Sequence, residues 1–358
     1  MMRTPQPSQR PGWLSLSALT LQMLSVTLLV AAPLGGAAPK PPTGANDAAP
    51  AARMEILRLD KDLDAVIEPG TQIERVATGF KFVEGPMWRQ GRLWFSDLVG
   101  NKMYAVAPDG KAELLIDHSG GLENPPAGSY TGSNAMVTEK SGSVLMLQHG
   151  MRRIVRLDDH FGMHPFLERF EGKRFNSPND LVFASDGALW FTDPPFGLPG
   201  QDHDPAKEIA FNGVFRYSNG KRTAPIRDLH LPNGIAFSPD GKTLYVSNSG
   251  PKMLVMKYRV GTDGALTDGK TLIEYPDEKT SSVPDGMKVD SAGNIWSSGP
   301  GGIRIIAPSG TVLGQLILPE TAANLAWGDD GKTAYITAST SIYKLRMRIN
   351  GNLPVYQR

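Results

Sequence analysis

The chain has 358 residues, of which 40% are hydrophobic and 20% charged, and this is the composition of a soluble globular protein. Lys plus Arg (37) almost equals Asp plus Glu (36), and this disfavours a nucleic-acid partner, because phosphate binding needs a clustered positive field. The sequence contains no cysteine, which excludes disulfides, thiolate metal sites, cysteine nucleophiles and a lipid-modified N-terminal cysteine.

Residues 1–38 have the order of a secretory signal peptide. Arg3 and Arg10 precede an apolar core from Leu14 to Leu34, and small residues follow at positions 35–38. We therefore expect cleavage near residues 32–38 and a secreted or periplasmic protein with no membrane contact afterwards. An uncleaved membrane anchor is the alternative, because the apolar stretch is almost long enough to span a bilayer.

The next two segments connect this leader to the fold. Residues 39–52 are polar and rich in proline, and we expect a disordered linker there because they have little to bury. Residues 53–70 contain an amphipathic stretch, Met54 to Ile67, which we expect to form a short helix on the outside of the domain. Residues 71–80 precede the first sequence repeat and belong to none of its copies.

A short phrase recurs six times in the rest of the chain, and each copy opens with a residue that has a side-chain oxygen. The copies are Glu84-Gly-Pro-Met-Trp, Asn134-Ala-Met-Val, Asn179-Asp-Leu-Val, Asn233-Gly-Ile-Ala, Asp285-Gly-Met-Lys and Asn324-Leu-Ala-Trp. A turn glycine follows each copy, at Gly91, Gly142, Gly187, Gly241, Gly293 and Gly331. Units of this length with several short strands predict an all-β fold, a six-bladed β-propeller with four-stranded blades over residues 71–350.

The fourth unit shows the expected blade most clearly. Its inner strand is Ile235 to Phe237, and Ser238-Pro-Asp-Gly241 has the residues of a type I turn. The sixth unit is one strand short, so we expect residues 71–80 to supply its outer strand and close the ring, which also hides a free sheet edge. We interpret the tryptophans of the repeats as packing between blades; these are Trp94, Trp190, Trp296 and Trp327.

The polar residue that opens each copy should lie at the start of an inner strand and point toward the axis. Two of the six are acids and four are amides, and oxygen ligands of this kind suit Ca²⁺ before Mg²⁺ or Zn²⁺. The alternative is that Asn and Asp merely satisfy turn backbone, which is most plausible for Asn324 and for one of Asn179 and Asp180.

A second polar set falls at the ends of the second strands: Asp97, His149, Asp193 and Asn248. We expect it to surround the mouth of the same channel, and we assign substrate contacts to His149, Asn134 and Asp193. His149 is a candidate substrate hydrogen-bond partner or proton shuttle. The alternative is that this histidine ties down a loop.

Five phrases of the chain resemble the gluconolactonase/senescence-marker-protein-30/luciferin-regenerating-enzyme family, in particular its bacterial gluconolactonase branch. They are Glu84-Gly-Pro-Met-Trp, Asn176-Ser-Pro-Asn-Asp-Leu-Val182, Phe191-Thr-Asp-Pro-Pro-Phe-Gly197, Leu231-Pro-Asn-Gly-Ile-Ala-Phe-Ser-Pro-Asp-Gly241 and Val283-Pro-Asp-Gly-Met287. The resemblance runs from about residue 72 to 345. It implies a six-bladed propeller that binds one divalent metal, usually calcium, through Glu84, Asn179, Asn233 and Asp285, with Asp285 as the catalytic acid/base.

One position departs from the family pattern. Animal members have an arginine two residues before the asparagine that matches Asn179, where it contacts substrate, and this chain has Ser177 there. The sugar contacts of the family are therefore not transferred, and Arg152 and Arg153 are the candidates to replace that arginine.

The resemblance implies metal-dependent hydrolysis of sugar lactones, with Ca²⁺ as the first choice of metal and Zn²⁺, Mg²⁺ or Mn²⁺ as alternatives. In this hypothesis the cation polarises the lactone carbonyl and Asp285 draws a proton from water. The alternatives are a hydrolase of other esters or phosphotriesters on the same fold, and a secreted binding propeller without catalysis. The expected partner is a small lactone or ester, with no nucleic acid and no prediction of the oligomeric state.

Overall fold

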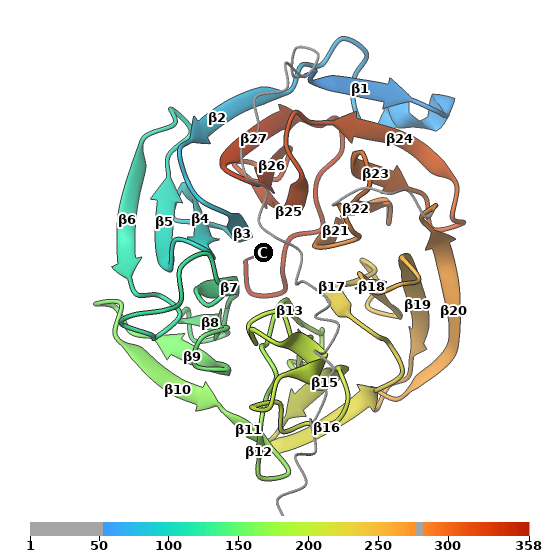
Figure 1. Cartoon of the computed structure of the whole chain (residues 1–358). Coiled ribbons are helices and arrows are strands. Elements are labelled where there is room, and N and C mark those ends of the chain that lie inside the picture. Colours follow the sequence, from blue (N-terminus) through green and yellow to red (C-terminus); the bar gives the residue numbers. More distant parts are fainter. Residues whose placement is uncertain (1–52, 277–281, 358) are drawn as a thin grey trace, which may run out of the picture. The chain divides into compact units, whose positions relative to one another are not determined.

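The computed structural model describes residues 53–276 and 282–357, so the expected signal peptide (1–38) and linker (39–52) lie outside the described residues. Six small antiparallel sheets surround a central axis, with their first strands innermost (Figure 1). The predicted six-bladed propeller with four-stranded blades is confirmed. Within the described residues, no helix is long and apolar enough to cross a membrane.

Each blade is an antiparallel sheet whose strands follow one another outward from the axis. Blade one contains β3 (Val83–Arg89), β4 (Arg92–Asp97), β5 (Lys102–Val106) and β6 (Ala112–Asp117). Blade two contains β7 (Ser133–Thr138), β8 (Val144–Gln148), β9 (Arg153–Leu157) and β10 (Met163–Leu167). Blade three contains β13 (Leu181–Phe183), β14 (Leu189–Asp193), β15 (Gly213–Ser218) and β16 (Lys221–Ile226).

The other three blades follow the same order. Blade four contains β17 (Pro232–Phe237), β18 (Thr243–Asn248), β19 (Leu254–Val260) and β20 (Leu266–Glu274). Blade five contains β21 (Met287–Val289), β22 (Ile295–Gly299), β23 (Gly302–Ile306) and β24 (Val312–Ile317). Blade six contains β25 (Ala322–Gly328), β26 (Thr333–Ala338) and β27 (Ser341–Arg346). A small hairpin of β11 (Arg169–Phe170) and β12 (Lys173–Arg174) and a 3₁₀ turn η2 (Gln201–His203) lie in the connections around blade three.

The tight turns between inner and second strands explain the repeated glycines. In blade four the Gly241 amide donates to the Ser238 carbonyl at 2.9 Å, as the sequence predicts for a type I turn. Gly241 has φ +69°, a left-handed conformation that a residue with a Cβ adopts at a cost. The turn therefore fixes where β17 ends and β18 begins.

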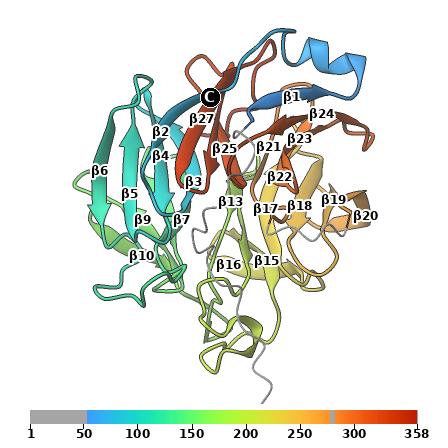
Figure 2. The ribbon, with the colours of Figure 1, turned by 45° about the horizontal axis from the view of Figure 1, so that its top comes forward.

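Strand β2 (Glu74–Thr78) completes blade six, as predicted from the missing strand of the sixth repeat. It runs antiparallel to β27, with Glu74 opposite Lys344 and Thr78 opposite Ser341, and Figure 2 shows the two strands side by side. The chain thus joins its first and last units in one sheet, which closes the ring by hydrogen bonding.

The segment before β2 differs from the single helix that we expected over Met54 to Ile67. Glu55–Arg58 forms strand β1, which pairs with β24 as a fifth strand of blade five, and only Lys61–Ala65 forms a 3₁₀ helix, η1. The Leu59 and Asp60 amides both donate to the Leu313 carbonyl, which holds the chain on the sheet edge. The apolar residues of the amphipathic pattern still pack against the domain, since Leu63 and Ile67 are fully buried.

The core lies between neighbouring blades. The Trp296 and Trp327 rings meet edge to face at 5.3 Å across blades five and six, and Trp88 stacks on Tyr335 at 5.1 Å where blade one meets blade six. The four tryptophans of the repeats are at most 5% exposed, as predicted for residues that pack blades together.

The C-terminal tail, residues 347–357, returns to the centre of the ring (Figure 1). The Asn352 amide donates to the Val289 carbonyl of blade five, and Tyr356 packs edge to face on Phe183 of blade three. The Gln357 side-chain amide donates to the Trp88 carbonyl of blade one at 2.8 Å. The tail therefore links inner strands of several blades at the end of the channel where those strands finish.

We predict that a chain ending at Gly351 is less stable than the full protein but keeps the propeller fold. The truncation removes the Asn352 and Gln357 hydrogen bonds, at about 1 kcal/mol each, and one aromatic pair at about 1 kcal/mol. At 2–4 °C per kcal/mol, the midpoint of thermal unfolding should fall by roughly 6–12 °C. A chain ending at Gln357 is the control and should melt like the full protein. Equal midpoints for the Gly351 and Gln357 truncations would contradict a fastening role for the tail.

Candidate metal centre

Five inner strands begin near side chains that carry oxygen, and all five lie at the same end of the channel. They are Glu84, Asn134, Asn179, Asn233 and Asp285, which we call the axial ring. The strand register makes them equivalent. In each blade, the residue two positions after the ring member pairs with the same position of the second strand. Ile235, two after Asn233, pairs with Val246, and Leu181, two after Asn179, pairs with Phe191.

The sixth blade does not contribute an oxygen to the axial ring. Leu325 pairs with Ile336 as Ile235 pairs with Val246, so the equivalent position is Ala323 and not Asn324. The prediction of six equivalent polar positions is therefore wrong in this blade. The phrase Asn324-Leu-Ala-Trp resembles the other copies only when it is shifted by one residue, and a shift of one reverses the face of a strand.

Neighbouring inner strands are joined to one another where the axial ring lies. The Gly234 amide donates to the Asp285 carbonyl at 3.1 Å, and the Gly286 amide donates to the Ala323 carbonyl at 2.8 Å. A Cβ built on Gly286 would lie 2.0 Å from the Asn324 side chain. The glycine after the polar residue is thus required by the close approach of two blades.

The carboxyl groups of Glu84 and Asp285 lie close enough at the axis to interact electrostatically. Burial raises the pKa of Glu84 to about 7, with a further contribution from Asp180. Burial and the nearby Glu84 charge raise the pKa of Asp285 well above its ordinary value. Two desolvated carboxylates of like charge are costly together, and a cation between them relieves that cost.

Three amide oxygens of the axial ring have no donor. The Oδ1 atoms of Asn134, Asn179 and Asn233 are buried, and no group in the described part of the chain donates a hydrogen bond to them. A buried acceptor without a partner costs about 1–3 kcal/mol, so three of them in one ring call for a ligand that accepts oxygen lone pairs. A hard cation is such a ligand.

The donor set therefore fits a cation of the Ca²⁺ type. It combines two carboxylates with neutral amide oxygens and offers neither sulfur nor imidazole. In residues 53–276 and 282–357, no group of three or more His, Cys, Asp or Glu side chains could hold a metal. The axial ring has only two acids, and its other oxygens come from amides. Of the two acids, Glu84 is 3% exposed and Asp285 is half-buried, so Asp285 is the less buried of the pair.

His149 lies beside the axial ring and positions one of its members. Its Nδ1 is 3.1 Å from the Tyr130 carbonyl, which can only accept, so Nδ1 carries the proton. Burial lowers the pKa of His149 to about 4, and the neutral ring therefore accepts from Asn134 Nδ2 through Nε2 at 3.3 Å. This bond fixes the Asn134 amide with its oxygen as the free atom. A proton shuttle at neutral pH is not supported by such a depressed pKa, whereas a positioning role is.

Tyr130 also lies near the ring. It is one of the few large apolar side chains that is exposed, at 38%, and its ring packs edge to face on Phe82. Burial raises the pKa of the Tyr130 hydroxyl, and the charge of Asp285 adds a smaller contribution in the same direction.

The second polar set braces the backbone before the inner strands. Asp193 accepts from the Asn176 and Ser177 amides at 2.8 Å each, with one oxygen for each amide. Asp97 and Asn248 hold the segments that lead into β3 and β17 in the same manner. In strand register the blade-two equivalent is Gln148, so His149 lies one residue beyond this set. The structure thus gives Asp193 a bracing role in place of the substrate contact that we expected.

The two arginines considered as replacements for the missing family arginine are engaged elsewhere. Arg152 is buried and donates to the Phe175, Asn176 and Ala206 carbonyls. Arg153 donates to Gln148 and pairs with Glu168. The Ser177 hydroxyl bonds the Pro194 carbonyl, so this position serves the loop.

Sequence reasoning missed a polar network just below the axial ring. It consists of Asp180, Lys288 and Asn324, and Asn324 Nδ2 donates to Glu84 Oε2 at 3.1 Å. One signal was available in the sequence. The position of Lys288 in the inner strand is apolar in the other five blades. Its equivalents there are Met87, Val137, Val182, Ala236 and Ala326.

Comparison with known proteins identifies the family. Residues 82–340 match the family described as SMP-30/Gluconolactonase/LRE-like region. The chain belongs to this family. The match covers all six inner strands and therefore the whole axial ring.

Individual relatives are similar over most of their length. A gluconolactonase of Zymomonas mobilis is 38% identical over 313 residues, which are 83% of this chain and 87% of the relative. A 6-deoxy-6-sulfogluconolactonase of Pseudomonas putida is 34% identical and covers 72% of this chain and 82% of its own. The solved structure of a gluconolactonase from Xanthomonas campestris superposes with a TM-score of 0.72 at 32% identity, and covers 82% of this chain and 94% of its own.

We predict a pH-dependent contribution of His149 to stability. The folded protein keeps the ring neutral down to about pH 4, while the unfolded chain takes up a proton below about pH 6.5. The free energy of unfolding should therefore fall between pH 6.5 and pH 4 by up to about 3 kcal/mol from this residue. Denaturant titrations of the wild type and H149Q across this pH range give the free energy of unfolding of each protein. The difference between the two plots of this free energy against pH is the contribution of His149. H160Q, at an exposed histidine, is the control and should follow the wild type. Parallel curves for the wild type and H149Q would contradict the assignment.

Proposed function

We propose that the protein hydrolyses sugar lactones with one bound divalent metal, Ca²⁺ in the first instance. Glu84, Asn179, Asn233 and Asp285 would hold the ion, and Asn134 offers a further oxygen. The single observation that carries the proposal is the convergence, at the starts of the inner strands, of two interacting carboxyl groups and three buried amide oxygens that have no donor within the described residues.

The reaction class rests on family membership and on the lactonase names of its relatives. Lactonase activity is what relatives from Zymomonas and Pseudomonas have in common by name, although the sugars differ between them. We therefore propose a sugar lactone as the substrate class and leave the particular sugar to the screen below.

Asp285 is the proposed general acid/base. It is the less buried acid of the pair, whereas Glu84 is buried and accepts a hydrogen bond from Asn324. The Asp285 carboxylate takes a proton from a water molecule as the water oxygen bonds to the lactone carbonyl carbon. The carbon–oxygen bond of the ring then breaks, and Asp285 returns the proton to the leaving ring oxygen, which gives the open hydroxy acid. When bound, the divalent ion supplies Lewis acidity that stabilises charge on the carbonyl oxygen.

The other residues orient rather than react. His149 holds the Asn134 amide, Asp193 holds the backbone that leads to Asn179, and Asn324 holds Glu84. Tyr130 is exposed, its carbonyl accepts from His149, and its ring is the proposed face on which a sugar packs. We also retain the proposal that residues 1–38 direct the protein to the periplasm or the exterior.

We predict that D285N keeps the fold and loses at least 100-fold in kcat on its best lactone, because the amide cannot accept the water proton. Steady-state kinetics together with thermal unfolding measure the two properties. E84Q should instead weaken the binding of Ca²⁺, seen by calorimetry. D240N is the matched control, since Asp240 lies in an exposed turn of blade four, and it should retain wild-type kcat. Full activity of D285N would refute the assignment of the base.

We predict that the activity depends on a divalent ion and prefers lactones. Metal analysis of the purified protein should find about one divalent ion per chain, and a chelator should abolish turnover that Ca²⁺ restores. A panel of aldonolactones, aryl esters and phosphotriesters tests the substrate class. Phosphotriester turnover above that of every lactone would favour a different hydrolase, and binding of ligand without turnover would favour a binding protein.

A further inference from the structure

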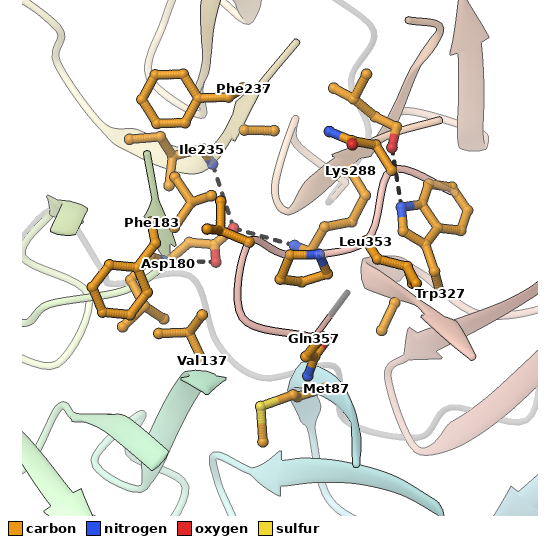
Figure 3. A pocket seen from close by; sticks show the side chains of 18 of the residues that line it. Met87, Val137, Asp180, Phe183, Ile235, Phe237, Lys288, Trp327, Leu353 and Gln357 are labelled. Atoms are coloured by element: carbon orange, nitrogen blue, oxygen red, sulfur yellow. Dashed lines mark hydrogen bonds and ion pairs between the residues drawn. The ribbon is translucent and has the colours of Figure 1, made fainter. Parts of the chain in front are cut away.

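The network below the axial ring contains the one inner-strand position where a charged residue replaces an apolar one, Lys288. Its ammonium donates to Asn324 Oδ1 at 3.1 Å and to the Met287 carbonyl at 3.0 Å, and it lies 3.7 Å from Asp180 Oδ2. Figure 3 shows Lys288 and Asp180 pointing toward one another from opposite sides of the channel. Three inner strands are thus tied together by one cation of the chain itself.

This network is continuous with the axial ring. Asn324 accepts from Lys288 with its oxygen and donates to Glu84 Oε2 with its nitrogen at 3.1 Å. Because Lys288 and the Leu325 amide both donate to Asn324 Oδ1, the nitrogen of the Asn324 amide faces Glu84. Lys288 thus helps to orient the Glu84 carboxylate, which also accepts from the Gly85 amide, without touching it.

The surroundings make the charge of Lys288 effective. It lines a cavity of about 140 Å³ below the ring. The cavity walls are largely apolar, with Met87, Val137, Phe183 and Trp327 among them, and the C-terminal tail closes it through Leu353 and Gln357 (Figure 3). Charges are screened less in such surroundings than at the surface.

The charges at the axis form a small set that interacts mutually. Glu84, Asp180 and Asp285 influence one another, and Lys288 is the cation that acts on Glu84 and Asp180. Three carboxylates and one ammonium have a net charge of −2, which equals the charge that one divalent ion neutralises. Without the ammonium the same set would have a net charge of −3.

We propose that Lys288 is a built-in counter-charge that matches the axial ring to a divalent rather than a trivalent cation, and that it positions Glu84 through Asn324. This inference rests on the proposed function, since it concerns the same cation site. Lys288 is a positioning residue here, because its ammonium contacts Asn324, Asp180 and the Met287 carbonyl, none of which belongs to the axial ring.

Metal binding to the full chain tests the charge directly. Metal-free wild type, K288M and K288Q are titrated with Ca²⁺ and with Tb³⁺, by calorimetry and by terbium luminescence with Ca²⁺ competition. K288Q retains a hydrogen-bond donor without the charge, and serves if K288M does not fold. We expect the ratio of Tb³⁺ affinity to Ca²⁺ affinity to rise at least tenfold in the neutral variants, because a trivalent ion gains more from the lost positive charge.

Two controls separate charge from structure. K288R keeps the positive charge, and K242M removes a lysine from an exposed turn of blade four, so both should keep the wild-type ratio within about threefold. A purely structural role of Lys288 would change both affinities by the same factor, and an unchanged ratio in the neutral variants would overturn the inference. Wild type that binds neither ion would instead overturn the proposed metal site itself.

Discussion

The hydrogen bonds between inner strands at the axis are the constraint on which the site depends. Each blade has its own sheet, and the ring brings the inner strands close enough for the Gly234 and Gly286 amides to bond the next blade. These bonds fix the position of the residue just before each glycine. Side chains from distant repeats therefore meet at one point without any direct link in sequence.

The channel is divided along its axis into layers of different chemistry. The axial ring gathers buried oxygens, the layer below holds the Lys288 network, and the layer beneath that is apolar and closed by the tail. Apolar walls thus lie on the lower side of the ring. Such surroundings strengthen electrostatic interactions at the ring relative to the protein surface.

A second division separates residues that hold the site from residues that would perform chemistry. Asp97, Asp193 and Asn248 use their side chains on backbone amides that precede the inner strands, and each repeats the same device in its own blade. In blade two, His149 instead orients the side chain of Asn134 through a hydrogen bond. The buried polar groups around the channel are therefore mostly structural, and the proposed chemistry rests on the acid pair at the centre.

The sequence by itself determined the number of blades, the turn glycines, the closing strand β2 and most of the axial ring, because a repeat records local structure at fixed spacing. Six polar positions were predicted, and five of them, including the pair Glu84 and Asp285, form the axial ring. Only the tertiary structure decided the rest. It shows that Ala323 replaces Asn324 in the ring, that Glu55–Arg58 is a strand, and that Lys288 lies beside Asp180. A shift of one residue along a strand and a contact between distant blades leave no mark in local sequence, because both depend on which backbone the neighbouring blade presents.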